Sequence, residues 1–150
     1  MANTYTNLVY HFIFSTKSRE TTIAAELAQQ LYPYIATIIR NLHGVPIEIG
    51  GRPDHIHIIY RLKPDVSIPD MLRTIKANSA KWVNETGKTK IHFAWQTGYG
   101  VFSVSGSRLD SIVKYVLNQA EHHRTRNFQA EFKEFLSANK IAFDERHLWE

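Results

Sequence analysis

The segment Ile47–Leu62, IEIGGRPDHIHIIYRL, contains the pattern from which the fold of this chain can be worked out. From His55 onward the residues have the character of a strand, in which side chains two residues apart point to the same side. One face of this strand would carry His55, His57, Ile59 and Arg61. The opposite face would carry an apolar set that predicts contact with the core, namely Ile56, Ile58, Tyr60 and Leu62.

His55 and His57 are candidate metal ligands because a strand would hold their imidazoles side by side. Imidazole is a common metal-binding group in proteins, and two ligands on one rigid strand form a partly preorganised site. We expect this strand face to be open, so that replacing His57 by alanine would cost little stability, and the alternative to metal binding is that both histidines are solvated there. A single His-x-His pair is too short a motif to decide between the two interpretations, so the choice depends on residues elsewhere in the chain.

The residues before this strand predict a hairpin, a helix and a further strand. Gly50–Asp54 is rich in turn-forming residues, so Val45–Gly50 is expected to pair with the histidine strand as a hairpin. Apolar residues at helical spacing predict a helix over 27–42, which Pro33 would kink or break into two pieces. Asn7–Ser15 has apolar residues on both faces, which is typical of a strand inside a sheet.

The residues after the histidine strand complete a regular order of elements. Ser67, followed three residues later by Asp70, predicts the start of a second helix that ends near Gly87. Tyr99–Ser105 predicts a fourth strand. The order βαββαβ is that of the ferredoxin-like fold, an α+β antiparallel sheet backed by helices. Because this fold serves many functions, it does not by itself indicate an activity.

The C-terminal third predicts additional helices. Ser107 is expected to cap a third helix with Asp110 in its first turn, and Tyr115 and Gln119 would share one edge of its apolar stripe. A short fourth helix would present an apolar face made of Phe128, Phe132, Phe135 and Leu136. The tail is expected to pack back onto the body through Phe143, Leu148 and Trp149.

Composition narrows the class of protein. The 150 residues fit one domain, 1–150, with a core of ordinary size. The chain has no cysteine, which excludes disulfides and thiolate metal sites, and no apolar run is long enough to span a membrane. The first residues lack the pattern of a signal peptide, so we expect a cytoplasmic protein. A net charge of +4 with eight histidines favours a polyanionic partner such as nucleic acid.

Tyr115 and Gln119 add a second chemical feature. A tyrosine hydroxyl can attack phosphorus and hold it as a covalent phosphotyrosine. The glutamine carbonyl oxygen is a hard ligand, suited to Mg²⁺ or Mn²⁺ beside imidazoles. One helical turn separates the two residues, so a metal ion held by Gln119 would lie near a phosphate facing Tyr115. The alternative is that both residues only pack at a helix edge.

Taken together, these residues show that the chain resembles the single-tyrosine HUH transposases of the insertion-sequence 200/605 type. The resemblance runs from about Val9 to Trp149 and covers nearly the whole chain. The matching features are DHIHIIYRL, the strand YGVFSVS, the block VKYVLNQAEHH and the following F-x-x-E-F-x-x-F-L. The histidine pair, the tyrosine and the glutamine occur in the order and the predicted strand-helix context of the family.

The resemblance implies a DNA transposase that cuts and rejoins single-stranded, hairpin-bearing element ends. It implies that Tyr115 is the nucleophile and that His55, His57 and Gln119 bind the Mg²⁺ or Mn²⁺ ion. Attack would leave a 5′-phosphotyrosine and a free 3′-OH. The family also implies a homodimer with shared active sites, in which the tyrosine helix reaches the partner's histidines and Gly106 provides the joint.

The remaining candidate residues are less closely tied to the motifs. Asp54 is expected to orient an imidazole, since metal-bound histidines usually hold a partner through their second nitrogen, or else to serve only in the turn. His122 is a candidate base for the tyrosine proton, or a solvated helix residue. Trp95 and Tyr99 would stack on unpaired bases or pack in the protein. The candidate phosphate contacts are Arg52, Lys76, Lys81 and Arg108.

Three other functions are compatible with parts of the sequence. An HUH nickase of replication or conjugation would use the same chemistry, but the small size and the single candidate tyrosine favour a transposase. A non-catalytic nucleic-acid-binding domain would use the sheet, yet the RNP-type aromatic motif of such domains is missing. A small metal hydrolase built on His55 and His57 would need further ligands that the sequence does not clearly place.

Overall fold

A computed structural model describes residues 3–124 and 126–150. Its centre is a four-stranded sheet made of β1 (Val9–Ser15), β2 (Val45–Arg52), β3 (His55–Arg61) and β4 (Gly100–Ser103). The strands lie in the order β2-β3-β1-β4, and each neighbouring pair is antiparallel. This order, with its helical crossovers, confirms the predicted ferredoxin-like fold.

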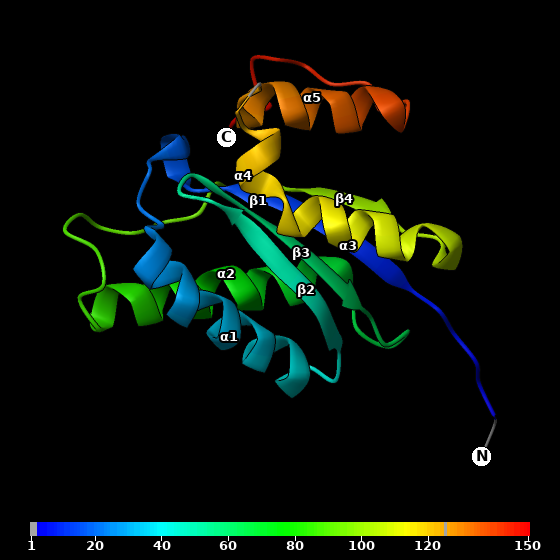
Figure 1. Cartoon of the computed structure of the whole chain (residues 1–150). Helices are drawn as coiled ribbons and strands as arrows, with labels where there is room; N and C mark the ends of the chain where they lie inside the picture. The colour runs from blue at the N-terminus through cyan, green and yellow to red at the C-terminus, as the bar shows by residue number, and fades with distance from the viewer. Residues whose placement is uncertain (1–2, 125) are drawn as a thin grey trace.

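Helices cover both faces of the sheet (Figure 1). One face packs against α1 (Ala25–Asn41) and α2 (Ile68–Glu85). The other face lies under the three C-terminal helices, α3 (Leu109–Leu117), α4 (Gln119–His122) and α5 (Phe128–Ala138). Among the described residues, the structure contains no helix with both the length and the apolar character that crossing a membrane requires.

The alternation of β3 separates its two faces as predicted. Ile56, Ile58, Tyr60 and Leu62 are buried in the core shared with α1 and α2. The ring of Tyr60 stacks on that of Phe12 from β1, with centroids 4.6 Å apart. Burying each such side chain contributes about 1.5–3 kcal/mol, so this face accounts for a large part of the stability of the fold.

The histidine face of β3 is covered, which corrects the expectation of an open strand face. His55 and His57 both have 0% of their surface exposed. The cover consists of apolar side chains from α3 and α5 that pack on this side of the sheet, among them Val116, Phe128 and Phe132. Removing an imidazole from here therefore affects packing as well as chemistry.

Two glycines allow these helices to lie close to the sheet. A Cβ atom on Gly50 of β2 would lie 2.5 Å from the carbonyl oxygen of Val116 in α3. A Cβ atom on Gly100 of β4 would lie 2.4 Å from the ring of Phe132 in α5. Both separations are shorter than atoms tolerate, so glycine at these positions sets how closely α3 and α5 approach the strands.

The N-terminal helices agree with the sequence in most details. The expected helix over 27–42 forms as α1, but it continues through Pro33 as one helix instead of two pieces. The Ser67 side chain caps α2 by accepting a hydrogen bond from the Asp70 backbone N–H at 3.2 Å. The helix is followed by Gly87 with a φ of 64°, as the predicted glycine stop requires.

The C-terminal elements differ more from their predictions. Ser107 does not cap α3, because it lies inside a 3₁₀ turn, Gly106–Arg108, that precedes the helix. The predicted single third helix is interrupted at Asn118, which separates α3 from α4. In the tail, Leu148 and Trp149 pack against the cluster around α5 as expected, whereas Phe143 is 39% exposed.

Candidate active site

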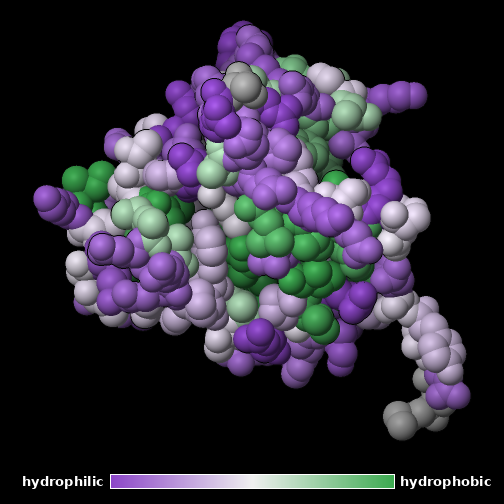
Figure 2. Space-filling view, viewed as in Figure 1, coloured by the Kyte–Doolittle hydropathy of each residue, from purple (hydrophilic) through white to green (hydrophobic). Residues whose placement is uncertain are grey.

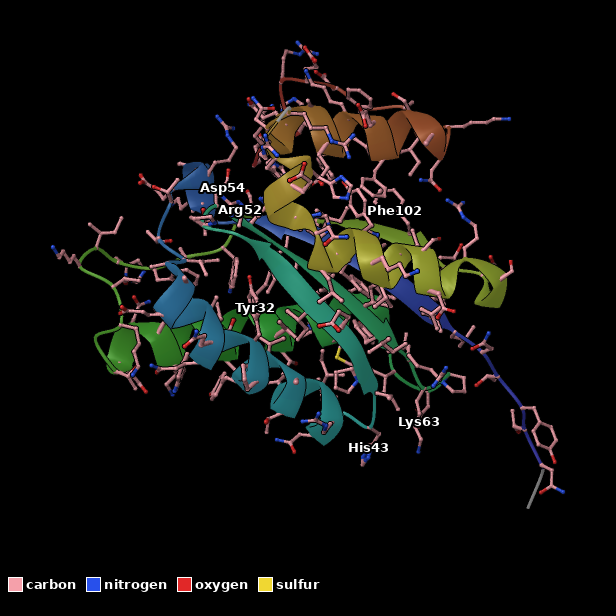
Figure 3. The ribbon with its side chains drawn as sticks, viewed as in Figure 1. Tyr32, His43, Arg52, Asp54, Lys63 and Phe102 are labelled. Atoms are coloured by element: carbon pink, nitrogen blue, oxygen red, sulfur yellow. The ribbon has the colours of Figure 1, made fainter. Side chains whose placement is uncertain are left out.

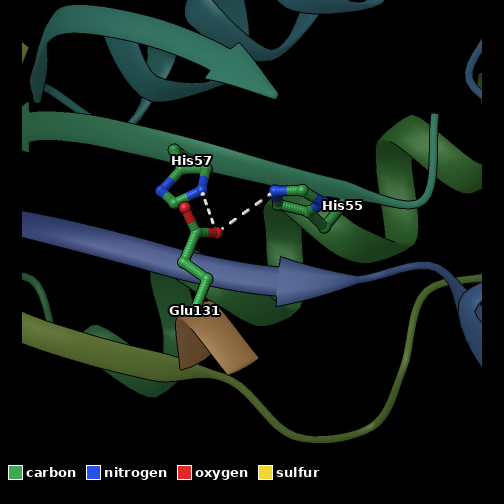
Figure 4. Close-up of side chains that lie close together, drawn as sticks. All are labelled: His55, His57 and Glu131. Carbon is green, nitrogen blue, oxygen red and sulfur yellow. Dashed lines mark hydrogen bonds and ion pairs between the residues drawn. The ribbon is translucent and has the colours of Figure 1, made fainter. Parts of the chain in front are cut away.

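Four elements bring polar side chains together on the covered face of the sheet. Strand β3 supplies His55 and His57, α3 supplies Tyr115, α4 supplies Gln119, and α5 supplies Glu131. Figure 4 shows the two imidazoles and the Glu131 carboxylate facing one another. The four predicted site residues (His55, His57, Tyr115 and Gln119) are therefore assembled within a single chain, together with a glutamate that was not predicted.

The Nε2 atoms of both histidines point into the site, and these inner nitrogens face oxygen atoms. His57 Nε2 lies 3.0 Å and His55 Nε2 lies 3.4 Å from Glu131 Oε1. His55 Nε2 also lies 3.1 Å from Gln119 Oε1. The Gln119 amide nitrogen donates to the Tyr115 carbonyl at 3.4 Å, which turns the amide oxygen toward His55.

The outer nitrogens of the histidines have partners of their own. His55 Nδ1 donates to Asp54 Oδ1 at 2.7 Å, so the expected orienting contact of Asp54 is present. His57 Nδ1 and His11 Nε2 share a hydrogen bond of 2.8 Å between two buried imidazoles. Because each outer nitrogen is engaged in this way, both rings are held with Nε2 directed at the centre of the site.

His55 and Glu131 favour their charged forms, whereas burial lowers the pKa of His57. Burial alone would lower the pKa of His55, but the hydrogen bonds that it donates to the Asp54 and Glu131 carboxylates raise it to about 9. Burial alone would raise the pKa of Glu131, but hydrogen bonds from His123, His55 and His57 hold it well below its usual range. A buried carboxylate is thus stabilised in its charged form by the imidazoles around it.

Tyr115 lies beside this cluster. Its hydroxyl donates a short hydrogen bond to Glu131 Oε2 and accepts one from the Arg126 guanidinium at 2.7 Å. Its ring stacks on His122, with centroids 4.3 Å apart. Burial and the neighbouring Glu131 carboxylate raise the pKa of the phenol, so the tyrosine is protonated here.

The donor set fits a divalent ion such as Mg²⁺ or Mn²⁺. His55 Nδ1 carries its proton toward Asp54, so a neutral His55 directs an Nε2 lone pair at the oxygens of Gln119 and Glu131. Such facing electron pairs need either an extra proton or a cation between them. Imidazole nitrogens together with carboxylate and amide oxygens are ligands that Mn²⁺ and Mg²⁺ accept.

Four residues of the site were not singled out in the sequence. Glu131 and His123 lie in the segments EHH and F-x-x-E-F, which were quoted as part of the family pattern but were given no role. His123 Nε2 lies 3.2 Å from Glu131 Oε1 and 3.1 Å from Gln119 Oε1. Arg126 and His11 carried no sequence signal, since their roles depend on contacts that only the folded chain makes.

The predicted phosphate contacts divide between two sides of the molecule. Arg52 ends β2 beside Asp54, at the hairpin tip near α4 (Figure 3), and Arg108 lies on the side of α3 and α5. Lys76 and Lys81 belong to α2, which covers the face of the sheet opposite His55. Of the residues considered for base stacking, Trp95 is in the core and Tyr99 is 38% exposed.

Lys76 holds the loop that contains residues 96–98 in place. We therefore expect substitution of Lys76 to lower the stability of the protein and to leave its affinity for DNA unchanged. Its ammonium donates to the carbonyls of Gln96, Thr97 and Gly98 at 2.8–3.1 Å. Lys76→Met is expected to lower the free energy of unfolding by about 1–3 kcal/mol by leaving these carbonyls unpaired. Thermal and urea unfolding measure the loss, and Lys81→Met, on the exposed side of the same helix, is the control. A large loss of DNA affinity in a folded Lys76→Met would contradict this assignment.

Comparison with known families decides the class of the protein. The profile of the family described as "Transposase IS200 like" matches residues 4–119, about three quarters of the chain. The chain belongs to this family. The predicted resemblance is confirmed, and the chain is in the class of DNA-cutting transposases. The match includes His55, His57, Tyr115 and Gln119 and ends before Glu131.

Individual relatives agree with this result. The ISDra2 transposase TnpA of Deinococcus radiodurans is 28% identical over 117 residues, which cover 75% of this chain and 84% of that protein. A crystal structure assigned as a transposase from D. radiodurans R1 superposes with a TM-score of 0.62 at 24% identity, covering 79% of this chain and 96% of that one. A REP-associated tyrosine transposase bound to a REP hairpin gives a TM-score of 0.61 at 18% identity, covering 82% of this chain and 73% of that one. These two similarities show that the fold is shared.

Proposed function

We propose that this protein cuts and rejoins single-stranded, hairpin-bearing DNA ends through a covalent bond to Tyr115. The observation that carries the proposal is that one carboxylate, that of Glu131, contacts both the Tyr115 hydroxyl and the Nε2 atoms of His55 and His57. The nucleophile and the candidate metal ligands are therefore neighbours. The family match supplies the class of reaction.

Each residue has a definable task. His55, His57 and Gln119 would hold a divalent ion, Mg²⁺ or Mn²⁺, which when bound acts as a Lewis acid toward a phosphate. The Tyr115 hydroxyl oxygen forms the new bond to phosphorus and releases one proton, while the bond from phosphorus to the 3′ oxygen breaks. The leaving oxygen takes up one proton, so the products are a 5′-phosphotyrosine and a 3′-OH. The energy of the broken linkage is retained in the 5′-phosphotyrosine, so a second 3′-OH can rejoin the strand without ATP.

DNA access requires a movement over the site. His55, His57 and Glu131 have no exposed surface, because α3, α4 and α5 cover them. Tyr115 is half-buried, but a scissile phosphate can reach the Nε2 atoms of His55 and His57 only when part of this cover shifts. Arg52 and Arg108 flank this side of the sheet and are the predicted phosphate contacts that we retain for the DNA backbone.

The surface offers a place for a second copy. Figure 2 shows apolar side chains gathered over β2, the edge strand of the sheet, and beside α3. The exposed or half-buried apolar residues of these elements include Val45, Ile47, Ile112, Val113 and Leu117. An unpaired edge strand with an apolar surface is typical of a docking surface, so we retain the predicted homodimer as part of the proposal.

The shared active site is a separate question from the dimer. In the described chain, Tyr115 and Gln119 already lie at the chain's own His55 and His57. A site shared between subunits would need α3 to leave this position, with the turn at Gly106 as the joint. We therefore favour a site that is completed within one chain.

The proposal is tested with single-stranded DNA oligonucleotides that fold into hairpins, their sequences taken from the DNA on either side of the gene. Purified protein is incubated with these strands and Mg²⁺ or Mn²⁺, and the covalent adduct is detected as a shifted band on a denaturing gel. We expect an adduct with either ion and none in EDTA. An adduct of equal yield in EDTA would exclude the metal role, and complete absence of an adduct with both ions would contradict the transposase activity.

The same assay separates the other functions considered. A nucleic-acid-binding domain without activity would shift the DNA on a native gel but leave it uncut. A metal hydrolase using His55 and His57 would cut the strand without retaining it on the protein. The nickase is not favoured, because the family match is to transposases.

A further inference from the structure

Glu131 is a charged side chain with no exposed surface, and α5 places it between the candidate metal ligands and the nucleophile. Its Oε1 atom faces the candidate metal ligands and its Oε2 atom faces the nucleophile. Burying a carboxylate in this way is costly unless specific partners compensate for the loss of water. The partners here are the histidines and the tyrosine that the proposed reaction uses.

We propose that Glu131 is a fourth ligand of the divalent ion and at the same time the residue that positions the Tyr115 hydroxyl. This inference rests on the proposed function and extends it to α5, which lies outside the part of the chain that matches the family. One carboxylate oxygen binds the ion, and the other accepts the hydrogen bond of the phenol. The distance between nucleophile and ion is then set by a single rigid group.

The separations between ligand atoms support the role of Glu131 as a metal ligand. Ligands at adjacent corners of an octahedron around Mg²⁺ are about 3 Å apart, since each lies about 2.1 Å from the metal. Glu131 Oε1 lies 3.0 Å from His57 Nε2 and 3.4 Å from His55 Nε2. Gln119 Oε1 lies 3.1 Å from His55 Nε2. One ligand atom from each of His55, His57 and Glu131 lies within 4.8 Å of the others.

Charge supports the same assignment. Two neutral imidazoles and an amide leave the full +2 charge of an ion uncompensated in a buried site. One carboxylate reduces this to a net charge of +1, which still attracts a phosphate. Among the described residues, Glu131 is the carboxylate that contacts the inner nitrogens of both His55 and His57, while Asp54 contacts the outer nitrogen of His55.

The positioning role of Glu131 rests on the two hydrogen bonds of the Tyr115 hydroxyl. The hydroxyl donates to Glu131 Oε2 and accepts from Arg126, so both its proton and a lone pair have defined directions. Without Glu131, the phenol would lose the acceptor that orients its proton toward the centre of the site. Arg126 in turn pairs with Glu134, one turn further along α5, so the same helix fixes both partners of the phenol.

The test compares metal binding by wild type, Glu131→Gln and Glu121→Gln without DNA. Glu121 is an exposed carboxylate on α4 that pairs with Arg124, so its variant controls for loss of charge alone. Free Mn²⁺ is measured by electron paramagnetic resonance. We expect Glu131→Gln to weaken Mn²⁺ binding at least about tenfold, as loss of a ligand or its support does at metal sites, and Glu121→Gln to bind as wild type does.

The positioning role has its own spectroscopic readout. In protein labelled with ¹³C at the tyrosine ring carbon that bears the hydroxyl, the Tyr115 signal is identified by its absence in Tyr115→Phe. We expect this signal to shift in metal-free Glu131→Gln and to remain in place in Glu121→Gln. Circular dichroism checks folding, and Glu131→Asp, which keeps the charge but shortens the side chain, replaces Glu131→Gln if the latter does not fold.

The results separate this inference from the proposed function. Unchanged Mn²⁺ affinity in a folded Glu131 variant would overturn the ligand role, and an unmoved Tyr115 signal would overturn the positioning role, even where wild type forms the DNA adduct. A higher adduct yield in Glu131→Gln would also overturn the inference, because the carboxylate would then only block the phosphate. Failure of wild type to form an adduct, with the Mn²⁺ result intact, would count against the proposed function alone.

Discussion

Tyr115→Phe is expected to form no covalent DNA adduct while still binding the hairpin strand. The substitution removes only the hydroxyl oxygen that would bond to phosphorus. The ring keeps its stacking on His122 and its edge contact with Phe135, so α3 should stay in place. The loss of the hydrogen bonds to Glu131 and Arg126 should change stability by about 1–3 kcal/mol.

The measurement has two parts, because binding and chemistry must be separated. A native gel gives the affinity for the hairpin strand, and a denaturing gel with Mn²⁺ gives the yield of adduct. Tyr5→Phe is the matched control, since Tyr5 is 90% exposed and has no contact with the site. Adduct formation by Tyr115→Phe at the wild-type level would show that another residue is the nucleophile.

The histidine pair illustrates what local sequence predicts well. A period of two along β3 separates apolar from polar side chains, and this separation holds whichever elements later cover the strand. The hairpin of β2 and β3 is equally local, since only Pro53 and Asp54 separate the two paired strands. Tyr115 and Gln119 stay neighbours for a similar reason, because a spacing of four residues keeps them close even though the helix is interrupted at Asn118.

The covering of the histidines shows what local sequence does not contain. Phe128, Phe132 and Leu136 predict an apolar helix face, but the pattern does not say which surface that face will meet. An open face was therefore expected for β3, and substitution of His57 by alanine would have been expected to cost little stability. The structure places His57 in contact with His11 and Glu131 with no exposed surface, so this substitution should also destabilise the protein.

Glu131 is the clearest residue that local patterns miss. A glutamate between phenylalanines on a short amphipathic helix is usually a solvated side chain at the edge of the apolar face. Its burial here depends on histidines from β3 and on His123, which lie far apart in sequence from one another. Such a contact arises only when α5 is packed on the sheet, so it becomes visible in the tertiary structure alone.

Mixing two inactive variants decides whether the active site is completed within one chain or shared. His55→Ala removes a candidate metal ligand, and Tyr115→Phe removes the nucleophile. If sites are shared, a mixed dimer contains one site with both defects and one site with neither. Random mixing makes about half of the dimers mixed, so roughly a quarter of all sites would be intact in a two-fold dimer. If each site is completed within one chain, every site in the mixture carries a defect.

We expect no recovered adduct, because the described chain brings Gln119 to its own His55, and its own Tyr115 and His57 to the same Glu131 carboxylate. Subunit exchange is verified first with two differently sized tags. A mixture of wild type with each variant then shows that neither variant inhibits the wild-type protein. Both variants retain Glu131 and α5, but His55→Ala also removes a buried ring that stacks on Phe128, so circular dichroism must show that each variant is folded before mixing. With exchange demonstrated, recovery of about a quarter of wild-type adduct would show that α3 crosses to the partner, and would replace the single-chain site with a shared one.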